Sequence, residues 1–103
     1  MIKISVMYPH RDGGRFDMEY YTKSHMLMVQ GKLGAACKGI AVEQGLGGAA
    51  PGSPPAYTAF GHIYFDTVEA FQAAFAPHVE EFMSDVPNYT DLEPVVQVSE
   101  VKV

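Results

Sequence analysis

The sequence of 103 residues lacks long apolar runs, has one cysteine and holds few basic side chains. No stretch approaches the ~20 consecutive apolar residues that span a bilayer, and the first ten residues do not resemble a signal peptide. Cys37 alone cannot form an internal disulfide. Seven Lys and Arg side chains against twelve Asp and Glu give no basic surface for nucleic acid. We therefore expect a cytoplasmic protein that binds neither a membrane nor nucleic acid.

Charged side chains of both signs are also scarce. They make up 18% of the chain, whereas ~25% is usual in soluble domains. A chain of this length forms one domain, here residues 1–103, and a domain this small buries only about 65% of the surface of its unfolded chain. The surface that remains carries too few charges to be fully solvated. We therefore expect a second copy of the chain to cover part of it, in a homodimer.

Four segments are predicted as strands and three as helices. Alternation of apolar and polar residues predicts a strand from Ile2 to Tyr8. The other predicted strands are Lys38–Leu46, Tyr57–Phe65 and Pro94–Val103. The predicted helices are Met18–Leu33 after an Asp17 N-cap, Thr67–Ala76 after a capping box of Asp66 and Glu69, and Pro77–Met83. Glycine and proline are too dense between residues 45 and 56 for regular structure, so we expect a loop or flap there.

The resulting order βαββαβ is typical of an α+β, ferredoxin-like fold with a four-stranded antiparallel sheet. Helices cover one face of such a sheet and leave the other face open. The first and last strands carry Ile4, Val6, Val96 and Val98 on one side and mostly polar residues on the other. We expect the open face to pack on the same face of a second chain.

His25 is the strongest candidate for a catalytic residue. It lies in the middle of the first predicted helix on the same face as Tyr21, above a strand that ends at Tyr8. A histidine in this position needs a partner for each ring nitrogen, or access to a cavity. One interpretation is a core histidine satisfied by a tyrosine or a carbonyl group. The other is a general acid/base in a pocket between helix and sheet, with Tyr21 beside it.

Two patterns that suggest a cofactor or a metal fail on their context. Gly45, Gly47 and Ala50 match the dinucleotide-binding fingerprint, but prolines follow where that fingerprint requires a helix. The four histidines show no metal-binding spacing, although ligands can also converge from distant segments. We expect neither a metal nor a cofactor.

Other side chains are candidates for the wall or the rim of such a pocket. Methionine and phenylalanine side chains suit an adaptable apolar wall, and the loop between Pro87 and Pro94 supplies polar groups. We expect the small-molecule ligand to contact Tyr8, Tyr20, Met28, Phe82, Asn88 and Tyr89.

The segment DMEYYTKSHMLMVQ, residues 17–30, resembles the D-x-x-Y-Y-x-x-x-H-x-P signature of the EthD family, named for ethyl tert-butyl ether degradation. The segments PGSPPAYTAFGHIYFDTVEAFQAAFAPH and VPNYTDLEP are similar to the same family, so the resemblance extends over essentially the whole chain. Leu27 stands where the signature has proline. The resemblance implies a dimeric α/β barrel, in which two ferredoxin-like chains pack sheet to sheet. It places the motif histidine at His25 and the motif tyrosines at Tyr20 and Tyr21.

Two functions from different classes follow. Relatives in this superfamily include cofactor-free monooxygenases, dehydratases, isomerases and haem enzymes, so the fold leaves the reaction open. The first hypothesis is an oxygenase-like or proton-transfer enzyme that acts on a small apolar molecule, with His25 as acid/base and Tyr21 orienting it. The second is a non-catalytic protein that binds a small molecule and supports a partner oxygenase. A structural dimer without a pocket is a third possibility.

Overall fold

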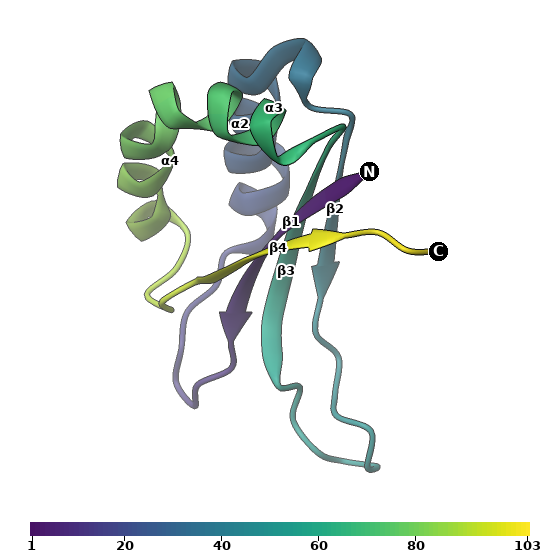
Figure 1. Cartoon of the computed structure of the whole chain (residues 1–103). Helices are drawn as coiled ribbons and strands as arrows, with labels where there is room; N and C mark the ends of the chain where they lie inside the picture. Colours follow the sequence, from purple (N-terminus) through teal and green to yellow (C-terminus); the bar gives the residue numbers. More distant parts are fainter.

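One antiparallel sheet carries all the helices on a single face (Figure 1). The computed structural model describes residues 1–103. Its strands are β1 (Ile2–Pro9), β2 (Gly39–Gln44), β3 (Tyr57–Phe65) and β4 (Val95–Glu100), in the spatial order β2-β3-β1-β4. This is the order of a ferredoxin-like βαββαβ chain, so the predicted fold class is confirmed. None of the helices is long and apolar enough to cross a bilayer.

The strand register decides which side chains face the helices. β1 pairs antiparallel with β3 through Ile4 and Ile63, and with β4 through Val6 and Val96. Ile4 and Tyr8 are fully buried beneath the helices. Val96 pairs with a helix-facing residue and yet is 57% exposed. The helices therefore cover the centre of the sheet and leave β4 partly bare.

The first helix begins as the sequence predicts and contains an irregular turn. The Asp17 side chain accepts a hydrogen bond from the Tyr20 backbone N–H at 3.0 Å, which caps the helix. The helix runs through α1 (Met18–Tyr20), a π-helical turn η1 (Tyr21–His25) and α2 (Met26–Leu33), and a 3₁₀ turn (Gly34–Ala36) follows it. The π-turn shifts the phase of the helix, so Met26 is buried while Met28 is only half-buried.

The second helical region comprises α3 (Val68–Phe75), η3 (Ala76–His78), α4 (Val79–Asp85) and η4 (Val86–Asn88). The prediction that Asp66 caps α3 is wrong. Thr67 is the N-cap, because its backbone is extended and its hydroxyl accepts a hydrogen bond from the Ala70 backbone N–H at 3.0 Å. Asp85 is the last residue of α4, and the 3₁₀ turn η4 follows it directly.

The face of the sheet opposite the helices is partly apolar and carries no element of this chain. Met7, Phe60 and Tyr64 lie half-buried on it, and Val95 is 50% exposed. At its centre, Nδ1 of His62 and the Ser5 hydroxyl share a hydrogen bond of 3.0 Å. The loop between β2 and β3 projects beyond the sheet, at the end farthest from α3 (Figure 1). The glycine- and proline-rich segment therefore forms an excursion, as predicted.

Candidate functional site

The π-turn points both Tyr21 and His25 toward the sheet. Their rings lie nearly parallel, with centroids 5.6 Å apart and an interplanar angle of 13°. Both residues are buried, whereas Lys23 and Ser24 between them are exposed. π-turns inside helices occur frequently at functional sites because the added residue reorients side chains.

Asp85 at the end of α4 holds the imidazole of His25. Its Oδ2 lies 2.8 Å from His25 Nδ1. Its other oxygen, Oδ1, accepts hydrogen bonds from the Tyr20 hydroxyl at 2.7 Å and from the Asn88 side-chain amide at 2.8 Å. The carboxylate therefore links η1 to α4 and leaves neither of its oxygens without a partner.

These hydrogen bonds favour the ionised form of Asp85. Partial burial alone would raise the pKa of Asp85, but hydrogen bonds from Asn88, His25 and Tyr20 lower this pKa below its ordinary value. An ionised Asp85 accepts hydrogen bonds only, so Nδ1 of His25 carries a hydrogen. In the neutral ring the lone pair then lies on Nε2, which is the atom that can act as a base.

The Nε2 atom of His25 is accessible from the cavity. No hydrogen bond joins it to another residue. Because no side-chain nitrogen or oxygen of the chain is both fully buried and without a partner, Nε2 keeps some accessible surface. His25 also lines the cavity described below. A small molecule in that cavity can therefore reach the basic nitrogen.

Three tyrosine side chains meet beside His25. The hydroxyls of Tyr8 and Tyr89 are hydrogen-bonded, 2.6 Å apart, and the Tyr21 ring packs against both of their rings. Burial, followed by the proximity of the other tyrosines, raises the pKa of Tyr8 and of Tyr21 far above the ordinary value. Burial likewise raises the pKa of Tyr89, although its hydrogen bond with Tyr8 opposes the change. All three therefore stay protonated and serve as hydrogen-bond donors.

A cavity of about 110 Å³ lies between the sheet and the helices, next to these groups. Twelve of its fourteen lining residues are hydrophobic. They come from every strand but β2 and from all the longer helices: Val6, Tyr8, Tyr21, His25, Met26, Val29, Ile63, Phe75, Phe82, Met83, Val86, Tyr89, Pro94 and Val96. Met83 and Val96 are more than half exposed and mark its mouth. The only polar side-chain groups in its wall are the three tyrosine hydroxyls and His25.

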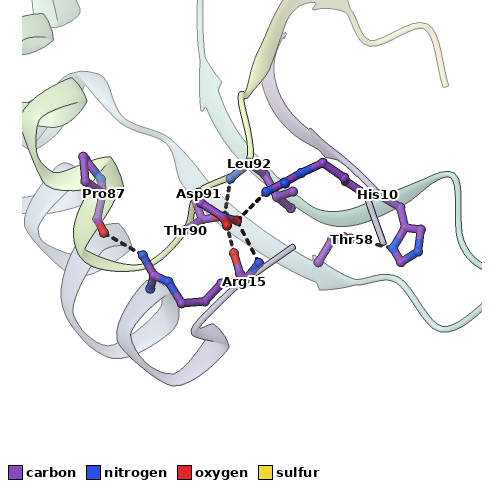
Figure 2. Close-up of polar contacts among 8 residues, drawn as sticks. His10, Arg15, Thr58, Pro87, Thr90, Asp91 and Leu92 are labelled. Atoms are coloured by element: carbon purple, nitrogen blue, oxygen red, sulfur yellow. Dashed lines mark hydrogen bonds and ion pairs between the residues drawn. The ribbon is translucent and has the colours of Figure 1, made fainter. Parts of the chain in front are cut away.

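The segment that carries Asp85 and Tyr89 is tied to the loop before α1. Figure 2 shows the Arg15 guanidinium donating to the Pro87 carbonyl, at 2.8 Å, and the Thr90 hydroxyl donating to the Arg15 carbonyl, at 2.6 Å. Asp91 accepts a hydrogen bond from the Arg15 backbone N–H and pairs with Arg11. These contacts, led by the Arg15 N–H, lower the pKa of Asp91. The anchoring fixes the loop on which Tyr89 lies.

The structure brings most of the predicted site residues together in two layers. His25, Tyr21, Tyr8, Phe82 and Tyr89 line the cavity, while Tyr20 and Asn88 bind Asp85 from behind. Met28 lies outside the cavity, in a shallow hollow beside Tyr20 and Asp85.

Asp85 was missed from the sequence. Its one signal there is an acidic residue in the last turn of a helix, where the helix dipole disfavours negative charge. The chain brings no three His, Cys, Asp or Glu side chains together as a metal-binding group.

The EthD domain model matches residues 15–93 of the chain. An EthD-like protein from Ralstonia eutropha JMP134 is 49% identical, with 99% of this chain and 92% of that chain covered and a TM-score of 0.95. An ethyl tert-butyl ether degradation family protein from Bacillus halodurans C-125 is 16% identical, with 99% of both chains covered and a TM-score of 0.67. No curated protein matches the sequence.

The fold extends beyond close relatives. A protein from Bordetella bronchiseptica, provisionally assigned as an antibiotic biosynthesis monooxygenase, is 13% identical, with 99% of this chain and 96% of that chain covered and a TM-score of 0.59. At this identity the likeness shows the fold alone. The family match and the Ralstonia relative go further, and the chain belongs to the EthD family.

Proposed function

We propose that this protein is an acid/base enzyme that acts on a small, largely apolar organic molecule bound between η1 and the sheet. The observation that carries the proposal is His25, which is held through Nδ1 by an ionised Asp85 and presents Nε2 to an apolar cavity. A carboxylate that fixes the tautomer and orientation of a histidine is the arrangement found in many general bases.

The first step of the reaction is removal of a proton from the bound molecule by Nε2. The positive charge that develops on His25 is stabilised by Asp85, 2.8 Å from Nδ1. The apolar wall excludes water, which strengthens this interaction. In a monooxygenase-type reaction the same deprotonation would come first, because an electron-rich carbanion is the species that reacts with O₂ when no metal takes part.

A homodimer is part of the proposal. The open face of the sheet carries Met7, Phe60, Tyr64 and Val95, and helices of this chain do not cover it. Packing against the same face of a second copy would bury these side chains. The scarcity of charge in the sequence supports the same arrangement.

The test is the elimination of 1,2-benzisoxazole, an apolar molecule that reacts when a base removes one C–H proton. The N–O bond then breaks and 2-cyanophenolate forms, which is followed by its absorbance. We expect the purified protein to accelerate this reaction, and we expect His25→Ala to lose at least about 100-fold of the rate. His78→Ala is the matched control, since His78 lies in η3 outside the cavity.

Thermal melting separates the two roles of His25. A folded His25→Ala variant that eliminates benzisoxazole as fast as the wild type would contradict the proposal. Binding of small apolar molecules without any turnover by the wild type would instead favour a carrier that supports a partner oxygenase. Unfolding of His25→Ala would favour a structural histidine, and His25→Gln would then be measured for the rate.

A further inference from the structure

The paired hydroxyls of Tyr8 and Tyr89 have one hydrogen more than they can use between themselves. Each hydroxyl donates one hydrogen, and a single hydrogen bond joins the two. No other acceptor is hydrogen-bonded to either hydroxyl. One O–H donor of the pair therefore lies in a largely apolar wall without a protein acceptor, whichever of the two donates to the other.

The spare hydrogen belongs to Tyr89 when Tyr8 donates to Tyr89. This direction fits the surroundings of the two residues. Tyr8 lies buried in β1 beneath the helices, whereas the Tyr89 ring lies beside His25, with centroids 4.7 Å apart. A buried donor without an acceptor is unfavourable, so the cavity favours a ligand that carries an acceptor.

A donor and a base thus lie on the same wall of the cavity. His25 Nε2 accepts a proton, and the Tyr89 hydroxyl donates a hydrogen bond to an oxygen nearby. A carbonyl compound with a hydrogen on the adjacent carbon presents an acceptor and an acidic hydrogen three bonds apart. A hydrocarbon presents neither, and a simple ether presents only the acceptor.

The size of the cavity limits the rest of the molecule. Its volume of about 110 Å³ is smaller than that of an apolar cavity of about 150 Å³ that holds benzene. A branched chain or a five-membered ring fills such a space, and a larger molecule such as 1,2-benzisoxazole extends out through the mouth between Met83 and Val96.

We propose that the substrate is a small enolisable ketone or aldehyde, whose carbonyl oxygen accepts the Tyr89 hydrogen while His25 Nε2 takes the proton from the neighbouring carbon. This inference rests on the proposed acid/base function and names its substrate class. The C–H electron pair becomes the new C=C bond, and the carbonyl π pair moves to oxygen as an enolate. Reprotonation by His25 restores the base, so no other reactant is consumed.

The experiment measures exchange of the α-hydrogens of cyclopentanone in D₂O by proton NMR. We expect the wild type to accelerate exchange over buffer, and we expect His25→Ala and Tyr89→Phe each to lose at least about 100-fold of that acceleration. Tyr57→Phe is the matched control, because Tyr57 lies at the start of β3 and does not line the cavity. It should exchange at the wild-type rate.

A second measurement, made on the wild type, tests the inference if the Tyr89→Phe variant does not fold. The infrared carbonyl stretch of cyclopentanone bound to the wild type should lie below its frequency in a hydrocarbon solvent, because a hydrogen bond weakens the C=O bond. An unshifted stretch, or a folded Tyr89→Phe variant with wild-type exchange, would overturn the inference.

The two assays keep the inference and the proposed function apart. If cyclopentanone does not exchange but benzisoxazole elimination depends on His25, the carbonyl substrate class is wrong and the acid/base function stands. If neither reaction is accelerated, both proposals fail.

Discussion

Gly61 in β3 gives the Tyr21 hydroxyl the space that it occupies. A Cβ atom at this position would collide with that hydroxyl and lie 3.2 Å from Tyr21 Cζ. Gly61 is also buried between its strand partners Val6 and Val42. The position of Tyr21, and with it the order of the tyrosine cluster, depends on the absence of this side chain.

We predict that Gly61→Ala lowers the unfolding free energy by about 1–3 kcal/mol, because Tyr21 must leave its place in a packed core. Chemical denaturation monitored by circular dichroism measures the change. Gly31→Ala is the matched control, since a Cβ atom there meets no atom within 4 Å. It lies in α2 and should stabilise the protein by about 0.5–1 kcal/mol. Equal effects at the two glycines would show that steric contact with Tyr21 is not the cause.

Asp85 sets which nitrogen of His25 carries the hydrogen. In Asp85→Asn the amide can donate to Nδ1, which moves the ring hydrogen to Nε2 and removes the lone pair from the cavity. We predict that this variant folds and loses at least about 100-fold of the base-catalysed rate on benzisoxazole. A rate within a few-fold of the wild type would show that His25 does not need Asp85 to act as the base.

The same substitution should change how stability depends on pH. The pKa of Asp85 is lowered in the folded state, so its carboxylate adds stability above the ordinary carboxyl pKa of about 4, and this stability is lost as the pH falls through the lower folded value. The difference in unfolding free energy between wild type and Asp85→Asn should therefore be largest at neutral pH and shrink in acid. Denaturation curves recorded from pH 7 to pH 3 test this.

At the scale of elements, α3 starts from a single threonine hydroxyl. Thr67→Ala should lower the unfolding free energy by about 1 kcal/mol, because the Ala70 N–H loses its acceptor. Thr67→Ser should keep most of the stability. Asp66→Ala breaks only an exposed ion pair with Lys38 at 3.7 Å and should change stability by less than about 1 kcal/mol. A larger loss from Asp66→Ala than from Thr67→Ala would restore Asp66 as the cap.

Elements with clear boundaries were predictable from the sequence. β3 runs from Tyr57 to Phe65 as predicted, because prolines precede it and a helix cap follows it. The helix start at Asp17 was equally clear. Asp66 and Thr67 are both good capping residues, and only the backbone conformation distinguishes them. Patterns of period two or 3.6 indicate faces, and they place His25 and Tyr21 correctly.

The parts of the site that the sequence did not show depend on distant contacts. His25 and Asp85 are 60 residues apart, and their pairing follows from how α4 packs beside η1. No local periodicity reports such a contact. The tyrosine cluster combines residues from β1, η1 and the loop after η4. The sequence predicted each of its members as a site residue but did not predict that their side chains contact one another.

At the scale of the whole molecule, the open sheet face sets the expected assembly. Phe60 lies half-buried there and stacks on His62, with ring centroids 5.7 Å apart. We predict that Phe60→Asp converts a dimer into a monomer, because pairing of two faces would bury a carboxylate without a partner. Light scattering at micromolar concentration measures the mass.

Leu27→Asp is the control for this prediction. Leu27 is 54% exposed on α2, on the helical side of the molecule. The same charge placed there should leave the mass of the dimer unchanged. A monomeric wild type, or a dimer that Leu27→Asp dissociates and Phe60→Asp does not, would move the interface away from the sheet.

The π-turn makes the site depend on the number of residues in the helix as well as on their identity. Lys23 and Ser24 are exposed and have no part in the cavity, so alanine scanning would report them as dispensable. Deleting either one would close the turn to a regular α-helix and leave Tyr21 and His25 three residues apart, about 300° around the helix axis, without the π-turn that stacks their rings. A deletion scan would therefore reveal a spacing requirement that substitution cannot detect, and a redesign that straightens this helix would need to restore it.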